Sequence, residues 1–420
     1  MRETDRPGGS WTFSAGWGVA FLTVILAFNY LDRTMLGLLL PLIKADLLLS
    51  DTTLGLISGL AFTLFYSLLG IPIASLADRS NRRNIIAAGF ALWSLMTVVT
   101  GWVGNAWQLA ACRFLLGAGE AAGLAPSQAM IADKVTEERR PLALSILATA
   151  SPINGLLFIP IAGWTADHYG WRTAFHLAGV VGLVLALLFF LTVREPPRRR
   201  AVEDKAVVPL LEAIRTLAGN RAFLWILVGA SFTGGSLYAT AAWTTTMLVR
   251  VHDFSVTRVA TLVTPLEATV AACGVLATGW LTNRLGRRDR RWRLWVPAIT
   301  CFACVPGYLA FLLGDAWQVW ATGFAVVAFF HLSYMGPIYA AVVSIAPPAM
   351  RAVAVSILVM FTGLVGQLTG PLIVGVLNDV LHPSLGIETI RYSLLVVAAS
   401  TLIGGLCFMA APIGRDAPTT

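Results

Sequence analysis

Charged residues are scarce in this chain. Only 12% of its 420 residues are charged, 57% are hydrophobic, and the mean hydropathy is +0.75. About a quarter of the residues of a soluble domain are charged, so the composition excludes the soluble globular classes. Histidine is also rare, and the five histidines are scattered, which argues against an enzyme with clustered catalytic groups. The sequence has no glycine-rich phosphate-binding loop of the P-loop type, which argues against an ATP-driven pump.

Long apolar stretches make up most of the chain. A helix needs about 20 apolar residues to cross a bilayer, and about twelve stretches qualify. They lie near 14–41, 53–76, 84–104, 107–133, 142–166, 172–193, 222–249, 257–282, 294–313, 317–346, 352–378 and 390–411. The sequence therefore predicts an all-α membrane protein with twelve transmembrane helices.

Basic residues follow every second stretch. They occur at 79–83, 134–140, 194–200, 284–293 and Arg351, whereas the intervening connections hold few. Lysine and arginine are retained on the cytoplasmic side, so we expect a multi-pass protein of the plasma (inner) membrane with both termini cytoplasmic. The net charge of +8 then reflects topology and contact with membrane lipids. Because the basic residues are dispersed, no nucleic-acid partner is expected.

A linker at 194–221 divides the stretches into an N-terminal six-helix bundle (1–193) and a C-terminal one (222–420). The two halves repeat each other. The shift of 211 residues that places Glu120 on His331 also places Pro126 on Pro337 and aligns two copies of Ser-Ile-Leu. Such repeats are typical of transporters, whose substrate site lies near the bilayer midplane between the repeats.

Several motifs carry a family resemblance. LADRSNRR, which ends at Arg83, resembles the signature loop of the major facilitator superfamily. NYLDR around Asp32, RFLLGAGEA around Glu120, and IADKVTEERR resemble the Spinster family of lysolipid and sphingolipid transporters. NYLDR alone does not distinguish the Spinster family, since organic anion:cation symporters carry nearly the same string. The resemblance implies two pseudo-symmetric six-helix bundles and proton-coupled alternating access, with protons as coupling ion and no other cofactor.

Four ionisable residues lie inside two of the most apolar stretches: Asp32, Arg33, Arg113 and Glu120. A charge at membrane depth costs about 2.5–3.5 kcal/mol on insertion scales, which favours a functional role over a structural ion pair. Counted from Gly16 at about 1.5 Å per residue, Asp32 lies toward the outer face at a level similar to Arg113, so the two can pair. Glu120 lies about 10 Å nearer the cytosol, alone among glycines.

These positions suggest distinct roles. Removal from water favours the protonated form of a carboxyl group, so Glu120 is the first candidate for proton coupling and Asp32 the second. Alternatively, Glu120 is a neutral acid bound to a backbone carbonyl. Arg113 is expected to clamp a phosphate or carboxylate bidentately, or to hold Asp32 when substrate is absent. Arg33 either lines the outer gate and binds substrate or snorkels to the interface.

The second half offers milder candidates. His331, Tyr334 and Gln367 are assigned to substrate binding, with a charged head group near Arg113 and an apolar tail against the C-terminal half. Alternatively, the His331 ring is structural and forms its hydrogen bonds with a neighbouring helix. Glu267 falls near mid-span by the same counting. Cys301 and Cys304 lie in an apolar helix, and no metal site is expected.

The signature loop predicts a cytoplasmic gate formed by Asp78, Arg79, Arg82 and Asp133. Asp78 is expected near the start of the eleventh span, where a helix N-terminus favours an acid. Arg79 is expected to reach Asp133 at the end of the fourth span. The alternative is a solvated basic turn that only sets topology.

The sequence therefore predicts a secondary active transporter of an anionic amphiphile such as a lysophospholipid or a sphingoid-type lipid, acting as a monomer. A proton-coupled symporter of small organic anions such as sugar acids is the alternative within this class. A polytopic lipid-modifying enzyme is the alternative from another class.

Overall fold

The computed structural model describes residues 13–136, 139–196, 210–347 and 350–412. Within these ranges the chain forms helices and turns and contains no strand. It divides into two compact units. Unit 1 is drawn from residues 1–35 and 64–201, and unit 2 from residues 36–63 and 202–420. The boundary at 201 falls inside the expected linker, and helix α1 (Phe13–Leu47) runs through both units.

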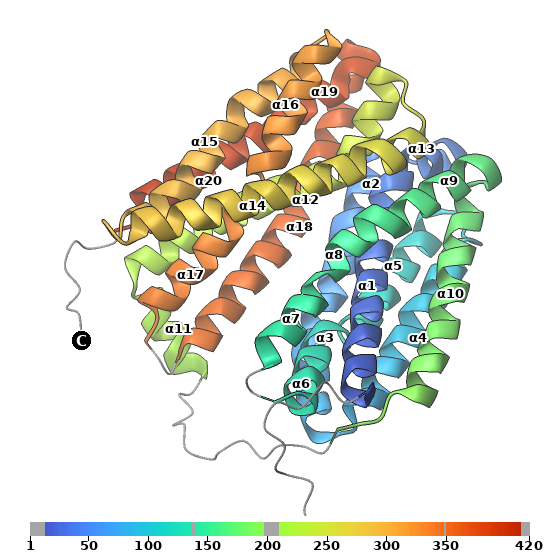
Figure 1. Ribbon diagram of the computed structural model, residues 1–420. Coiled ribbons are helices and arrows are strands. Elements are labelled where there is room, and N and C mark those ends of the chain that lie inside the picture. Colours follow the sequence, from blue (N-terminus) through green and yellow to red (C-terminus); the bar gives the residue numbers. More distant parts are fainter. Residues whose placement is uncertain (1–12, 137–138, 197–209, 348–349, 413–420) are drawn as a thin grey trace, which may run out of the picture. The chain divides into compact units, whose positions relative to one another are not determined.

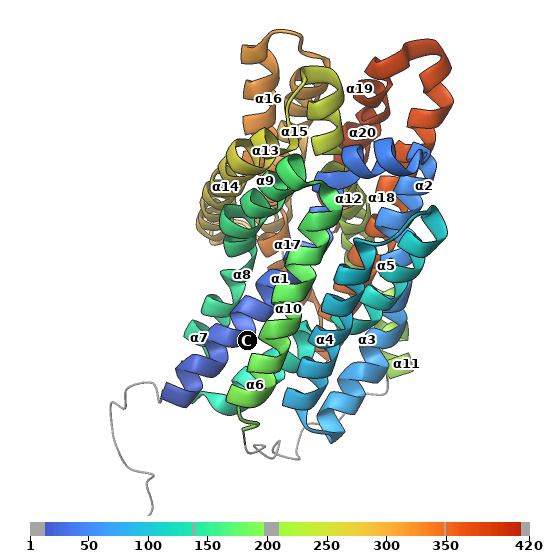
Figure 2. The ribbon, with the colours of Figure 1, turned by 90° about the vertical axis from the view of Figure 1, so that its right-hand side faces the viewer.

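Unit 1 is a bundle built around the first part of α1. Its other helices are α3 (Phe62–Arg79), α4 (Arg82–Thr100), α5 (Ala106–Glu120), α6 (Leu124–Lys134), α7 (Arg140–Ala148), α8 (Ala150–Ile153), η3 (Asn154–Phe158), α9 (Ile159–Tyr169) and α10 (Trp171–Thr192). Asparagine caps begin two of them, because the Asn81 and Asn105 side chains accept from the backbone N–H groups of Asn84 and Gln108. Figures 1 and 2 both show α4 and α10 side by side.

Close backbone approach joins α4 to α5 in unit 1. A Cβ atom on Gly119 would lie 2.9 Å from the carbonyl oxygen of Gly89 and 2.9 Å from the backbone nitrogen of Trp93. Small residues of this kind let transmembrane helices pack by direct backbone contact. Because Gly119 precedes Glu120, this contact also fixes the level of the Glu120 side chain.

Unit 2 contains the larger set of helices. They are α2 (Asp51–Leu56), η1 (Ile57–Ala61), α11 (Leu210–Ala218), α12 (Arg221–His252), α13 (Val256–Arg258), η4 (Val259–Val263), α14 (Thr264–Gly286), α15 (Trp292–Leu313), α16 (Trp317–Phe330), α17 (Met335–Ile345), α18 (Arg351–Leu385), η6 (Gly386–Glu388), α19 (Thr389–Ser393) and α20 (Leu395–Ala410). Helices α12 and α18 meet at glycines, since a Cβ on Gly370 would lie 2.2 Å from the Gly235 oxygen.

Ten helical stretches among the described residues are long and apolar enough to cross a membrane, two fewer than the twelve expected. Two features of the chain account for the difference. The stretch Val353–Ala410 contains both α18 and α20. The fourth expected span is interrupted by a turn between α5 and α6, and neither piece alone reaches the length of a span.

The repeat predicted from the sequence reappears as a repeated helix break. In unit 1, α5 ends at Glu120 and a turn leads to α6. In unit 2, α16 ends at Phe330, directly before His331, and a turn leads to α17. Pro126 and Pro337 lie in the first turns of the helices that follow. Each unit therefore places an ionisable side chain at a break in the middle of its membrane span.

Candidate functional site: a buried charge network in unit 1

An ion pair between α1 and α5 lies at the centre of unit 1. The Nε of Arg33 donates to Oε2 of Glu120 at 2.7 Å, with 22% of the Arg33 side chain and none of the Glu120 side chain exposed. The Arg33 guanidinium also lies over the ring of Tyr66 from α3, 4.6 Å from the ring centroid. The expectation that Glu120 stands alone is therefore wrong, and Arg33 points to this acid rather than snorkelling to the interface.

The helix lengths explain this correction. Helix α1 has 35 residues and is about 52 Å long, whereas a hydrocarbon core is about 30 Å thick. Counting from Gly16 as a membrane boundary therefore placed Asp32 and Arg33 too near the outer face. Both lie close to the middle of α1, and Glu120 lies at the midpoint of Ala106–Lys134. The long side chain of Arg33 spans the remaining difference in depth between its own backbone and Glu120.

Asp32 and Arg113 lie together in the same network, where Arg113 contacts the backbone of Asp32. The Asp32 carboxylate accepts from the Thr97 hydroxyl of α4 at 2.7 Å. Arg113 donates from Nη1 to the backbone oxygen of Asp32 at 3.1 Å. Asp32 is 3% exposed and Arg113 2%. Thr97, which holds the Asp32 carboxylate, was missed from the sequence because a lone threonine in an apolar helix carries no signal.

The network balances two acids against two arginines. Burying an ion pair costs desolvation energy that its mutual attraction only partly offsets, so such a cluster is poor evidence for a stabilising role. Oε1 of Glu120 is buried and has no hydrogen-bond partner among the described residues. A carboxylate with one free oxygen beside a guanidinium can take up a proton, and an arginine released by that proton can bind an anion.

A second polar centre lies inside unit 2. The hydroxyl of Tyr308 in α15 lies 3.2 Å from that of Thr240 and 3.4 Å from that of Ser236. The His331 ring packs edge-on against Tyr308 with centroids 5.9 Å apart, and its buried Nε2 has no partner within the described part of the chain. Within the same ranges, no three His, Cys, Asp or Glu side chains are grouped so that they could hold a metal ion. Sequence reasoning missed Tyr308, which lies among apolar residues.

The other two substrate-binding candidates of unit 2 are buried. Tyr334 belongs to the hydrophobic core, where its ring stacks on Phe408 with centroids 6.1 Å apart. Gln367 is 8% exposed and lies on α18, where its backbone oxygen closely approaches Gly59 of η1. Core packing and helix contact account for both positions, so their role toward a substrate stays a prediction.

The basic end of unit 1 holds the residues that were predicted to form a cytoplasmic gate. Arg82 forms an ion pair through Nη1 with Oδ2 of Asp133. Asp133 is thus held by Arg82, and the Arg79 side chain makes no hydrogen bond or ion pair among the described residues, so the prediction that it reaches Asp133 is wrong. Helix α3 ends at Arg79 and the Asn81 cap starts α4, which turns Arg82 toward α6. The side chain of Asp78 lies outside the described side chains.

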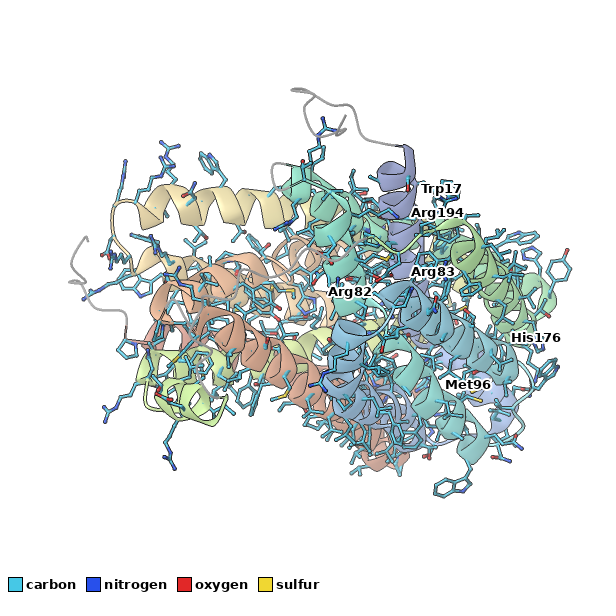
Figure 3. All side chains as sticks on the ribbon, turned by 90° about the horizontal axis from the view of Figure 1, so that it is seen from below. Trp17, Arg82, Arg83, Met96, His176 and Arg194 are labelled. Carbon is cyan, nitrogen blue, oxygen red and sulfur yellow. The ribbon has the colours of Figure 1, made fainter. Side chains whose placement is uncertain are left out.

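Glu195 reinforces this end of unit 1. Its carboxylate accepts from the backbone N–H groups of Arg82 and Arg83 at 3.1 and 2.8 Å, at the positive end of the α4 dipole. Lys134 donates to the backbone oxygen of Arg194 at 3.1 Å. Figure 3 shows Arg82 and Arg83 at the start of α4, with Arg194 on the segment that follows α10. The segment after α10 is thereby attached to the signature loop.

A charged cluster that the sequence did not suggest lies in unit 2, at the end of α12. Arg250 at the end of α12 donates from Nη1 and Nη2 to the two carboxylate oxygens of Asp51, at 2.7 and 2.8 Å. Lys44 donates to the same carboxylate at 2.6 Å. Asp379 of α18 accepts from the backbone N–H groups of Asp51 and Thr52 at 3.1 and 2.8 Å. The available signal was that Lys44 and Arg250 are among the few basic residues on that side.

Comparison with known proteins agrees with this architecture. The Major Facilitator Superfamily profile matches residues 22–308. An MFS-type efflux pump of Mycolicibacterium smegmatis is 32% identical over 97% of this chain and 94% of its own length. Protein spinster homolog 1 of Homo sapiens is 30% identical over 95% of this chain and 81% of its own length.

A solved structure agrees as well. A bacterial homolog of the human lysosomal transporter Spinster, in an inward-facing and unoccupied conformation, superposes with a TM-score of 0.84. The two chains are 25% identical, and the match covers 96% of this chain and 98% of that one. The buried charges thus lie in a transporter rather than an enzyme, and the chain belongs to the major facilitator superfamily, within which it resembles the Spinster proteins.

Proposed function

We propose that the protein carries an anionic amphiphile of the lysophospholipid or sphingoid type across the membrane, with proton coupling at Glu120. The observation that carries the proposal is the Arg33–Glu120 ion pair, in which a fully buried carboxylate neutralises a partly exposed arginine. The resemblance to Spinster proteins supports the substrate class.

Proton and substrate are linked through this pair. When Glu120 binds a proton, its attraction for Arg33 falls and the guanidinium becomes available to an anionic head group. An anion bound at Arg33 in turn makes a charged Glu120 less favourable and promotes protonation. Binding linkage is reciprocal, so proton and anion favour each other's binding. This sign of coupling favours movement of both in the same direction.

Arg113 supplies the second cation of the proposed site. Its planar guanidinium suits a phosphate or carboxylate, which a bidentate arginine binds with defined geometry. Thr97 holds the Asp32 carboxylate beside it, at 2.7 Å. Asp32 thereby offsets the Arg113 charge while the site contains no substrate, and it is the second candidate to carry a proton.

We propose the orientation from the loop charges. The basic ends of both units, which include Arg82, Arg83 and the segment 284–293, face the cytoplasm by the positive-inside rule, with the Asp51 cluster outside. Both termini are then cytoplasmic in a plasma-membrane protein that works as a monomer.

The test is transport by purified protein in proteoliposomes under an imposed pH gradient. Uptake of lysophosphatidylglycerol should follow the gradient, and Glu120→Gln should abolish this dependence while the protein stays folded. Glu267→Gln, which changes an intramembrane acid of unit 2, is the matched control, and its uptake should still depend on the pH gradient. Gradient-driven uptake of gluconate without uptake of lysolipid would replace the lipid with a sugar acid. No transport of either would overturn the proposal.

A further inference from the structure

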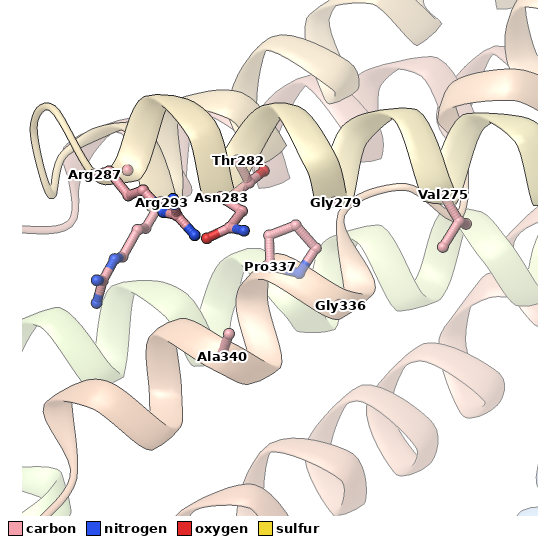
Figure 4. Close-up of a pocket in the computed structure, with 10 residues that line it drawn as sticks. Val275, Gly279, Thr282, Asn283, Arg287, Arg293, Gly336, Pro337 and Ala340 are labelled. Carbon is pink, nitrogen blue, oxygen red and sulfur yellow. The ribbon is translucent and has the colours of Figure 1, made fainter. Parts of the chain in front are cut away.

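Unit 2 contains a crevice of its own. It is formed by the last turns of α14, the start of α15 and the first half of α17, and its volume is about 530 Å³. Figure 4 shows Asn283, Arg287 and Arg293 along one end and Gly279, Gly336 and Pro337 further along α14 and α17. The crevice thus has a polar basic end and a small-residue apolar end.

The basic end has spare positive charge. Arg287 and Arg293 both line the crevice, and neither guanidinium group forms an ion pair or hydrogen bond within the described part of the chain. The acid of the same connection, Asp289, instead accepts from the backbone N–H of Arg291 at 2.8 Å. Two guanidinium groups and the Asn283 amide therefore remain available to an anion.

Thr282 of α14 borders the same crevice. It is 8% exposed. Its Oγ1 is buried and has no hydrogen-bond partner among the described residues. A buried hydroxyl without a partner is costly, because it has lost water and gained nothing in return. Because the crevice does not expose this hydroxyl, its polar lining consists of the Arg287, Arg293 and Asn283 side chains.

The apolar end continues into the membrane span. A Cβ atom at Gly279 or Gly336 would meet nothing within 4 Å, so both glycines leave open space. The lining extends one further turn along α14 to Val275. On the same helix Leu276 is 74% exposed and Trp280 60% exposed, which is suited to contact with hydrocarbon. A ligand held at the arginines would thus have an apolar path along α14.

We infer that this crevice binds an anionic glycerophospholipid of the adjoining leaflet. The phosphate lies between Arg287 and Arg293 and accepts from Asn283, while the glycerol and an acyl chain follow the glycine-lined slot toward Val275. Basic pockets between helices at the membrane surface bind such head groups. A free phosphate fits less well, because cavities of about 300–1,000 Å³ accommodate ligands of drug-like size. The lipid acts here as a bound component of the protein and not as cargo.

Native mass spectrometry of the full-length protein from nanodiscs with equal phosphatidylglycerol and phosphatidylcholine tests this inference. The wild type should retain phosphatidylglycerol about tenfold over phosphatidylcholine, the scale expected for one to two basic residues at the surface. R287Q/R293Q should lose that preference, and R288Q, which alters an arginine of the same turn outside the crevice lining, should keep it.

A steric variant makes the test independent of charge. Gly336→Phe fills the slot without changing any charge and should also abolish retention. Gly363→Phe, at another glycine with open space around it, is the control for this variant and should leave phosphatidylglycerol retention unchanged. An unchanged preference in both R287Q/R293Q and Gly336→Phe would overturn the inference. It would also be overturned if inorganic phosphate bound the delipidated protein through these arginines while the lipid preference stayed unaffected. Transport is not the readout, so the outcome does not depend on the proposed substrate.

Discussion

Replacing Glu120 with glutamine isolates the proposed coupling step. The amide has nearly the size of the acid and can still accept from Arg33 at the observed 2.7 Å, but it carries no charge. Because Arg33 stays charged, the amide keeps a hydrogen bond to a cation and loses only the ion-pair attraction, which for a half-buried pair lies between the about 0.2–1 kcal/mol of an exposed pair and the about 3–5 kcal/mol of a buried one. An anion that must displace Glu120 from Arg33 therefore gains about 1–2 kcal/mol when the acid becomes an amide, and 1.4 kcal/mol corresponds to about tenfold in affinity.

The assay is equilibrium binding of lysophosphatidylglycerol to purified protein over a range of pH. Wild-type affinity should rise as the pH falls, because protonation of Glu120 releases Arg33. Glu120→Gln should bind about tenfold more tightly than wild type at the alkaline end. At the acidic end the two should be equal, so the variant's affinity should be flat across the range. Glu267→Gln should reproduce the wild-type curve.

Two results would refute this reasoning. Weaker binding by Glu120→Gln at every pH would show that the carboxylate attracts the substrate instead of competing with it for Arg33. A wild-type pH dependence in the variant would show that another group takes up the proton, and Asp32 would then be the next residue to change.

Three further outcomes test other parts of the structure. Arg113→Lys should bind anionic lysolipid markedly more weakly because it lacks the planar fork, and Arg113→Ala should abolish its transport. Wild-type binding in Arg113→Ala would make that residue structural. Asp51→Asn should lower stability in thermal unfolding by about 2–3 kcal/mol, below the about 3–5 of a fully buried pair because Arg250 is partly exposed. An unchanged melting temperature would contradict this. Gly274→Ala should destabilise the protein, since its Cβ would lie 1.7 Å from the Phe329 oxygen, whereas Gly279→Ala has open space and should not. Equal melting temperatures would refute the packing argument.

The sequence by itself determined the class of protein and much of its organisation. Membrane crossing depends on the summed hydropathy of consecutive residues, which is a local property and is read directly. The internal repeat placed Glu120 and His331 at corresponding positions, and the structure has a helix break at each of them. The cost of charge in hydrocarbon singled out Asp32, Arg33, Arg113 and Glu120, and all four lie in one network.

Only the tertiary structure decided which of these groups meet. The partner of Glu120 is Arg33, the partner of Asp133 is Arg82, and Asp51 gathers Lys44 and Arg250. Residue counting along a span treats helices as straight rods normal to the bilayer, which neither the length of α1 nor the break after α5 allows. An ion pair forms where a long side chain can reach its counter-ion, and that depends on helix length, breaks and close backbone contacts between segments far apart in the chain.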